Sequence, residues 1–253
     1  MNIPAINGII RRRILLNYRV CPEVARATLP SIFRPKLVGG YAIMGICLIR
    51  LEEVRPKRLP KFLGISSENS AHRIAVDWVD QNGDKCEGVY VSRRDTDSRL
   101  NSLAGGRLFP GVHHLSSFQV DDDQGSISVR VTTADSPLPL LDLQVVETAD
   151  FPKSSVFGAL TEASTFFESG CIGYSARPDS CRLDGLLLQV EDWQVSSLAI
   201  SHARSSYFDD RSIFPTAGIE LDHALLMRDI PHEWHAQPEM TTDQLESSAQ
   251  ASG

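Results

Sequence analysis

Two adjacent histidines, His113 and His114, follow the glycine-rich segment 105–111 and form the first candidate for chemistry. Imidazole titrates near neutral pH, so either ring could act as a general acid or base. Arg107 lies in the glycine-rich segment, where the backbone can approach a ligand and a guanidinium can bind a carboxylate or phosphate through two hydrogen bonds. Neighbouring residues of a strand point to opposite faces, so at most one histidine can face a given cavity. The glycine spacing matches no phosphate-binding motif, and an ordinary connection is an equally valid interpretation.

Charged residues next to predicted strands form a second group of candidates. The segment 92–97 is unusually charged for a stretch between apolar strands and contains Arg94, while Glu68 precedes another predicted strand. Buried charges must be paired, so inward-facing side chains here would form either a structural ion pair or the polar end of a pocket. The basic clusters 11–13 and 55–61 could contact an anion, although such clusters are more often solvated surface.

Metal, redox and hydrolase motifs are not supported by the spacing of the relevant residues. The histidines of His232-Glu-Trp-His235 are three apart beside a proline, whereas the zinc protease motif places them four apart on a helix. The five cysteines are widely spaced without a CxxC pair, which is typical of reduced thiols. No Gly-x-Ser-x-Gly motif occurs. We therefore predict no metal and no cofactor.

The composition favours a small molecule as the partner. The chain has 253 residues, of which 42% are hydrophobic and 23% charged, as in folded globular proteins. A formal net charge of −7 argues against binding to nucleic acid or to an anionic membrane. No apolar run reaches the roughly 20 residues that span a bilayer, and the N-terminal charge order is the reverse of a secretory signal. These features predict a cytoplasmic protein, and they leave open whether it forms a homo-oligomer.

The elements that would position the candidate residues are mostly β-strands. The β-rich runs 74–79 and 86–91 flank Asn82-Gly83, a dipeptide typical of hairpin turns. A second hairpin is predicted from 115–120 and 126–132, where apolar and polar residues alternate in the later strand. Further strands are predicted at 14–20, 41–51, 183–190, 193–203 and 218–227.

Helices are few in the predicted structure. One helix is expected to begin near Ser154 or Ser155, to carry apolar side chains at helical spacing and to end at Gly170. A shorter helix is expected over 22–28, where Pro30 limits it. The longer helix should pack its aromatic face on a sheet.

The strand pattern favours one domain. The proline-rich segment 136–139 is the only candidate boundary, but the strands on its two sides have the same character. The residues from 236 onward have little to bury. We therefore predict a single mainly β (α+β) domain over 1–235 and a disordered tail over 236–253.

The order of several short motifs resembles the DUF2071 family of uncharacterised proteins, and the resemblance extends over most of the chain. These motifs are Tyr18-Arg-Val-Cys-Pro-Glu-Val24, Leu29-Pro30, Gly39-Gly-Tyr-Ala-Ile-Met-Gly-Ile46, Arg50-Leu-Glu-Glu-Val-Arg-Pro56, Glu68-Asn-Ser-Ala-His-Arg73, Gly88-Val-Tyr-Val-Ser92 and Phe166-Phe-Glu-Ser-Gly-Cys-Ile-Gly-Tyr-Ser175. That family is similar in fold to acetoacetate decarboxylase. The resemblance implies one β-rich domain around a closed, cone-like barrel whose interior holds the active site.

The related decarboxylases use a lysine that forms a Schiff base with a ketone or keto acid, and this lysine follows a proline. The corresponding segment here is Phe109-Pro-Gly-Val-His-His114, and no lysine occurs between Lys85 and Lys153. The resemblance therefore implies that the catalytic amine is missing at this place. It also implies that Arg11 corresponds to a substrate-holding arginine and Glu68 to an acidic pocket residue.

We accordingly expect an internal pocket that binds a small organic anion and is lined by some of Glu68, Arg94, Arg107, His113, His114 and Tyr174, with Arg11 as a further ligand-binding residue. If the protein is an enzyme, one of the two histidines would be its general acid or base. A non-catalytic binding or scaffold protein is the first alternative. The second is a Schiff-base lyase or decarboxylase that uses Lys57, Lys61 or Lys153 from another wall.

Overall fold

Strands dominate the computed structural model, which describes residues 5–99, 111–177, 181–215 and 218–242. Within these ranges, 13 strands form one sheet. The strands are β1 (Ile6–Val20), β2 (Arg34–Pro35), β3 (Leu37–Val38), β4 (Tyr41–Pro56), β5 (Ile65–Val79), β6 (Lys85–Thr96), β7 (His113–Asp123), β8 (Ser126–Thr133), β9 (Leu141–Thr148), β10 (Ile172–Ala176), β11 (Arg182–Val190), β12 (Ser196–Ser205) and β13 (Ile219–Thr241). The helices are α1 (Pro22–Ala27), the short η1 (Lys61–Leu63), α3 (Leu160–Ser169) and α4 (Ser206–Asp209).

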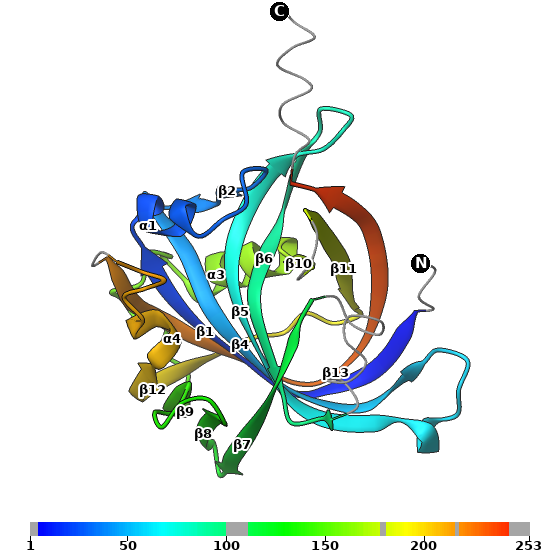
Figure 1. The fold of residues 1–253 in the computed structure, drawn as a ribbon. Coiled ribbons are helices and arrows are strands. Elements are labelled where there is room, and N and C mark those ends of the chain that lie inside the picture. Colours follow the sequence, from blue (N-terminus) through cyan, green and yellow to red (C-terminus); the bar gives the residue numbers. More distant parts are fainter. Residues whose placement is uncertain (1–4, 100–110, 178–180, 216–217, 243–253) are drawn as a thin grey trace, which may run out of the picture.

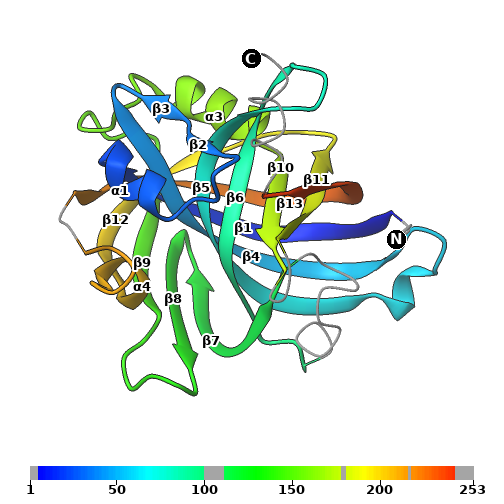
Figure 2. The same ribbon diagram turned by 45° about the horizontal axis from the view of Figure 1, so that its top comes forward.

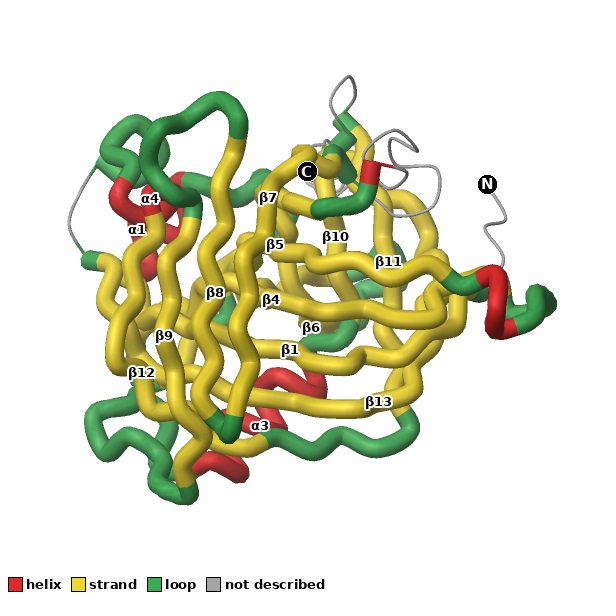
Figure 3. Tube along the Cα trace, turned by 90° about the horizontal axis from the view of Figure 1, so that it is seen from below, coloured by secondary structure: helices red, strands yellow, loops and turns green. Residues whose placement is uncertain are grey.

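The sheet closes on itself because two strand pairings go beyond the simple strand order. The pairings β5–β6, β6–β10, β10–β11, β11–β13, β13–β1, β1–β4 and β4–β5 form a first ring. A second ring runs from β6 through β7, β8, β9 and β12 to β13, and β1, β4 and β5 complete it as shared strands. Figure 1 shows the first ring between β6, β10, β11 and β13, and in Figure 3 β8, β9 and β12 cross the direction of β1, β4 and β13. The closed mainly β fold expected from the sequence is confirmed.

The strands shared by the two rings are buried on both faces. Along β1, Leu15 belongs to the core of the first ring, whereas Ile14 and Leu16 belong to the core of the second. Successive side chains of a strand point to opposite faces, so a strand between two cores needs an uninterrupted apolar sequence. This requirement explains the continuous apolar run 42–49 in β4, whose side chains are all buried.

The predicted hairpins are present, and four strands are additional: the two-residue β2 and β3, and β9 and β10. β5 and β6 are joined by a turn in which Gly83 has a φ of 87°, and β7 pairs with β8. β8 pairs directly with β9, so the proline-rich segment 136–139 connects neighbouring strands. Figure 2 shows β7, β8 and β9 side by side.

Several predicted strand bounds differ from the structure: β1 and β5 begin earlier than predicted, at Ile6 and Ile65, and β12 begins later, at Ser196. Two further boundaries also need correction. α3 begins at Leu160 and not at Ser154 or Ser155, because Ser155 is held outside the helix by a hydrogen bond to Asp222; its end next to Gly170 is as predicted. β13 continues through Thr241, and its last residues pair with β11, so residues 236–241 belong to the sheet. Residues 243–253 of the expected tail lie outside the described part. Among the described helices, none is long and apolar enough to cross a membrane.

Candidate functional site

A small interior cavity lies between strands of the first ring. Its volume is about 80 Å³, and β4, β5, β6, β7, β11 and β13 contribute to its wall. Its lining combines apolar and hydrogen-bonding residues: Ile49, Leu51, Ala71, Leu186 and Trp234 are apolar, and Asn69, Ser70, Arg94, Asp95 and His113 are polar. The Asp95 carboxylate is paired with Arg93. Such a combination is typical of small-molecule sites.

Arg94 is the cation in the wall of this cavity. Its Nη2 donates to Ser175 Oγ at 3.1 Å, and its Nε is buried without a hydrogen-bond partner among the described residues. Burial lowers its pKa to about 10, so the guanidinium is still charged at neutral pH. Gly111 packs against the same serine: it has a φ of 86°, and a Cβ there would lie 2.8 Å from Ser175 Cβ. The glycine thus allows the chain to approach Arg94 closely.

The two histidines lie on different faces of β7. In the parallel backbone pairing of β6 with β7, Arg94 lies opposite His113 and Asp95 lies opposite His114. His113 is partly buried and lines the cavity, whereas His114 is exposed. Burial, together with the nearby positive charge of Arg94, lowers the pKa of His113 to about 4. His113 is therefore neutral at physiological pH.

Two further arginines accompany Arg94 on the inner face of the ring. Arg13 Nε donates to Cys47 Sγ at 3.3 Å, and its Nη1 lies 3.8 Å from Met227 Sδ. Arg73 Nη2 donates to Asn17 Oδ1 at 2.7 Å. Burial lowers the pKa of Arg73 to about 10, and the nearby Cys47 opposes this shift for both Arg73 and Arg94. Of the three guanidiniums, that of Arg13 contacts the Cys47 thiol directly.

These three arginines share an unusual lack of carboxylate partners. Among the described residues, no Asp or Glu lies within ion-pair distance of Arg13, Arg73 or Arg94; their acceptors are sulfur, an amide oxygen and a hydroxyl. Buried charges without a counter-ion are costly, and they create a positive potential in the interior. An anionic ligand would supply the missing counter-charge.

The remaining candidates from the sequence lie elsewhere. Arg11 is exposed and binds Glu52 and Asp229 on the outer face. Tyr174 faces the other core, where its ring contacts Phe33 and Trp78. Arg107 lies outside the described residues. Of the candidates that the structure describes, only Arg94 and His113 are brought together in the cavity.

Glu68 forms a buried ion pair with Arg12, the residue next to Arg11 in the sequence. Both of its carboxylate oxygens accept from Arg12 Nη2, at 2.8 and 2.9 Å, and the side chain of Arg12 is only 6% exposed. Burial raises the pKa of Glu68, and the Arg12 charge counteracts this effect. The pair joins β1 to β5, which indicates a structural role.

Replacing Glu68 with glutamine should therefore destabilise the fold by about 3 kcal/mol, because a buried arginine loses its principal counter-charge. The matched control is Glu52→Gln, which removes a carboxylate from the exposed pair with Arg11 and should change stability little. Urea unfolding measures both effects. Equal stability of Glu68→Gln and the wild type would contradict the structural role.

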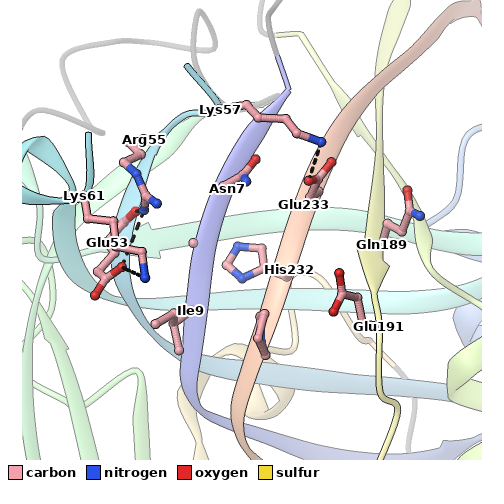
Figure 4. Close-up of a pocket in the computed structure, with 12 residues that line it drawn as sticks. Asn7, Ile9, Glu53, Arg55, Lys57, Lys61, Gln189, Glu191, His232 and Glu233 are labelled. Atoms are coloured by element: carbon pink, nitrogen blue, oxygen red, sulfur yellow. Dashed lines mark hydrogen bonds and ion pairs between the residues drawn. The ribbon is translucent and has the colours of Figure 1, made fainter. Parts of the chain in front are cut away.

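The lysines lie outside the interior cavity. Lys57 and Lys61 line an outer groove of about 380 Å³, shown in Figure 4, together with Glu53, Glu233 and His232. Lys57 Nζ lies 2.7 Å from Glu233 and Lys61 Nζ lies 4.0 Å from Glu53. The other lysines also lie elsewhere: Lys36 pairs with Glu87, and Lys85 and Lys153 are exposed.

The histidine pair of segment 232–235 is divided between the two faces of β13. The rings of His232 and Trp234 are in contact at a centroid distance of 4.2 Å, while His235 Nε2 lies 3.2 Å from Glu233 on the other face. In the described part of the chain, no three His, Cys, Asp or Glu side chains form a group that could hold a metal.

Sequence inspection singled out neither Arg73 nor Cys47 as a site residue, and it considered Arg13 only as a member of the basic cluster 11–13. Arg13 belongs to the basic run 11–13, which is typical of solvated surface, and only the fold shows that its three members have different surroundings. An available signal was the position of Arg73 directly before the apolar run 74–76: a charge within a buried strand requires a partner.

The closed sheet and its inner cavity define a protein with the acetoacetate decarboxylase-like fold. Acetoacetate decarboxylase from Legionella pneumophila superimposes with a TM-score of 0.61 at 13% identity, covering 94% of this chain and 90% of that chain. An acetoacetate decarboxylase-like enzyme from Sphingomonas wittichii RW1 gives a TM-score of 0.58 at 13% identity, covering 95% and 94%. The enduracididine biosynthesis enzyme MppR, complexed with pyruvate, gives 0.57 at 10% identity, covering 96% and 91%.

Within this fold, the chain belongs to the DUF2071 family of uncharacterized conserved proteins, whose sequence profile matches residues 10–218. No curated protein matches the chain. The low identities to the solved structures establish a common fold, and the chemistry has to be argued from the residues of this chain.

Proposed function

We propose that this protein binds a small organic anion, of the keto acid or carboxylic acid class, in the interior cavity. The observation that carries the proposal is the group of three inner guanidiniums without a carboxylate partner among the described residues. Arg94 lines the cavity and is the direct anchor for a carboxylate. Arg13 and Arg73 add positive potential around it.

The other features of the cavity agree with such a ligand. Its apolar lining, which includes Leu51 and Trp234, suits a short carbon chain. Its volume of about 80 Å³ restricts the ligand to a small molecule. The pyruvate in the complex of MppR, which has the same fold, makes this keto acid the first probe to use.

Calorimetric titration with pyruvate and with its neutral amide tests the proposal. We expect the wild type to bind pyruvate at least about tenfold more tightly than pyruvamide, because only the acid supplies a counter-charge to the inner arginines. Lactate and acetoacetate extend the series within the same class. Equal affinities for the acid and the amide would show that the cavity does not select anions.

His113 makes acid or base catalysis a second candidate function. Its neutral imidazole lines the cavity beside Arg94 and could accept a proton from the carbon next to a bound keto group. The reaction can be followed by NMR as exchange of the methyl protons of pyruvate with deuterium. His113→Gln should abolish any acceleration seen with the wild type, and His114→Gln is the matched control with an exposed ring. Unchanged exchange in His113→Gln would exclude this role, and no acceleration by the wild type would favour the non-catalytic alternative.

The Schiff-base alternative makes a different prediction. Lys57 and Lys61 pair with Glu233 and Glu53 in the outer groove, whereas iminium formation needs a lysine amine beside the bound keto group in the cavity. We therefore expect borohydride reduction in the presence of pyruvate to add no mass to the protein. An adduct located by peptide mapping at Lys57, Lys61 or Lys153 would instead support the lyase.

A further inference from the structure

We infer that Asp222 and His223 are positioning residues of the interior anion site and that they act on Arg73 through Asn17. The inference rests on the proposed function, in which Arg73 contributes positive charge to the cavity region. It follows from a row of residues that crosses four neighbouring strands. Asp222, His223, Asn17 and Arg73 are all absent from the cavity lining, so the row can act on the cavity only through the charge of Arg73.

Strand register places the members of the row side by side. His223 on β13 pairs with Asn17 on β1, Asn17 pairs with Gly45 on β4, and Gly45 pairs with Arg73 on β5. Because Gly45 has no side chain, Asn17 can reach across β4. A Cβ at this position would lie only 3.0 Å from Asn17 Oδ1 and 2.5 Å from the carbonyl oxygen of Leu16. The glycine therefore leaves the space that the contact with Arg73 requires.

A continuous series of hydrogen bonds runs along this row. Asp222 Oδ2 lies 2.6 Å from His223 Nδ1, and His223 Nε2 lies 3.1 Å from Asn17 Nδ2. Asn17 Oδ1 then accepts from Arg73 Nη2 at 2.7 Å. At the outer end, Asp222 accepts from Ser155 Oγ at 2.6 Å and from the backbone N–H of Val156 at 3.0 Å.

The donors and acceptors of the series determine one another. An arginine only donates, so Asn17 must present its oxygen to Arg73 and its amino group to His223. His223 Nε2 must then accept, and the ring proton is on Nδ1, from which it is donated to Asp222. Burial lowers the pKa of His223, although Asp222 opposes this shift, which agrees with a neutral ring. Asn17 Nδ2 also donates to the backbone oxygen of Leu15 at 2.9 Å, so Leu15 and Arg73 hold the same orientation of Asn17 that the Asp222 carboxylate supports through His223.

The surroundings make this arrangement rigid. His223 and Asp222 have fully buried side chains, and the imidazole contacts the rings of Phe157 and Phe167. The Arg73 guanidinium lies 4.7 Å from the centre of the Phe167 ring. Arg73 Nε has no hydrogen-bond partner among the described residues. The series thus holds Arg73 through one nitrogen with a neutral amide, so the positive charge is not cancelled by a direct carboxylate contact.

Asp222→Asn tests this inference through the tautomer of His223. The new amide would keep its oxygen toward the Val156 N–H and present its amino group to His223 Nδ1, so the ring proton should move to Nε2. Asn17 would then have to rotate and turn its amino group toward Arg73. We expect the histidine ¹⁵N spectrum to report the Nε2–H tautomer, and the affinity for pyruvate to fall about tenfold while that for pyruvamide stays unchanged.

Ser155→Ala is the matched control, because it removes one hydrogen bond from Asp222 but keeps the carboxylate. It should retain the Nδ1–H tautomer and the wild-type affinity for pyruvate. If Asp222→Asn changes the tautomer without weakening pyruvate binding, or leaves the tautomer unchanged, the inference is overturned while the anion site stands. If the wild type shows no preference for pyruvate over pyruvamide, the proposed function fails and the inference fails with it.

Discussion

Replacing Arg94 with glutamine should weaken pyruvate binding about thirtyfold. Glutamine retains a hydrogen-bonding amide but removes the charge, and charge-assisted hydrogen bonds to a buried carboxylate contribute about 2 kcal/mol more than neutral ones. The loss should be confined to anions, so binding of pyruvamide should change little. Isothermal titration calorimetry measures both affinities.

The fold should tolerate this substitution. Among the described residues Arg94 has a hydroxyl partner, Ser175, and no carboxylate partner, so its removal leaves no buried carboxylate unpaired. Arg130→Gln is the control: Arg130 is exposed and pairs with Asp142 on the outer surface, and its loss should not affect binding. Wild-type affinity for pyruvate in Arg94→Gln would show that Arg94 does not bind the carboxylate.

Acid should destabilise the protein steeply below pH 6.5 because three buried or partly buried histidines resist protonation. Burial lowers the pKa of His72 to about 3 and those of His113 and His232 to about 4. The unfolded chain binds protons at these rings as the pH falls below about 6.5, whereas the folded chain does not. Their stabilising effect is therefore complete above pH 6.5 and is lost progressively as the pH falls toward the folded pKa values.

The expected size of this loss follows from proton linkage. Each ring contributes about 1.4 kcal/mol per pH unit, so the three together should lower the free energy of unfolding by about 6 kcal/mol at pH 5. Urea titrations at several pH values measure the slope. His72→Gln should remove about a third of this slope, whereas the exposed His114→Gln should not change it. A slope that is unaffected by His72→Gln would mean that this ring is protonated in the folded state.

The strands that could be predicted from sequence are those whose signals are local. β5 and β6 flank an Asn-Gly turn, and β8 alternates apolar and polar residues, so short-range rules suffice. β10 has only five residues and is held by the next strand, β11, and by β6, which is distant in the sequence. The closure of the sheet likewise depends on pairings such as β11 with β13, and composition does not reveal these.

The candidate site was only partly predictable for a related reason. Arg94 and His113 could be singled out by residue type, but their common cavity arises from a parallel pairing of β6 with β7. Arg73 and Asn17 meet because of a glycine on the strand between them, which is a consequence of register. The three residues of the run 11–13 have different surroundings because β1 is irregular between Ile10 and Arg12.

A crystal structure of the protein with pyruvate tests the central claim most directly. We expect the carboxylate of pyruvate to lie within hydrogen-bonding distance of the Arg94 guanidinium, with its methyl group toward Leu51 and Trp234 in the interior cavity. Pyruvate bound only in the outer groove beside Lys57 and Lys61, with the interior cavity free of it, would contradict the account.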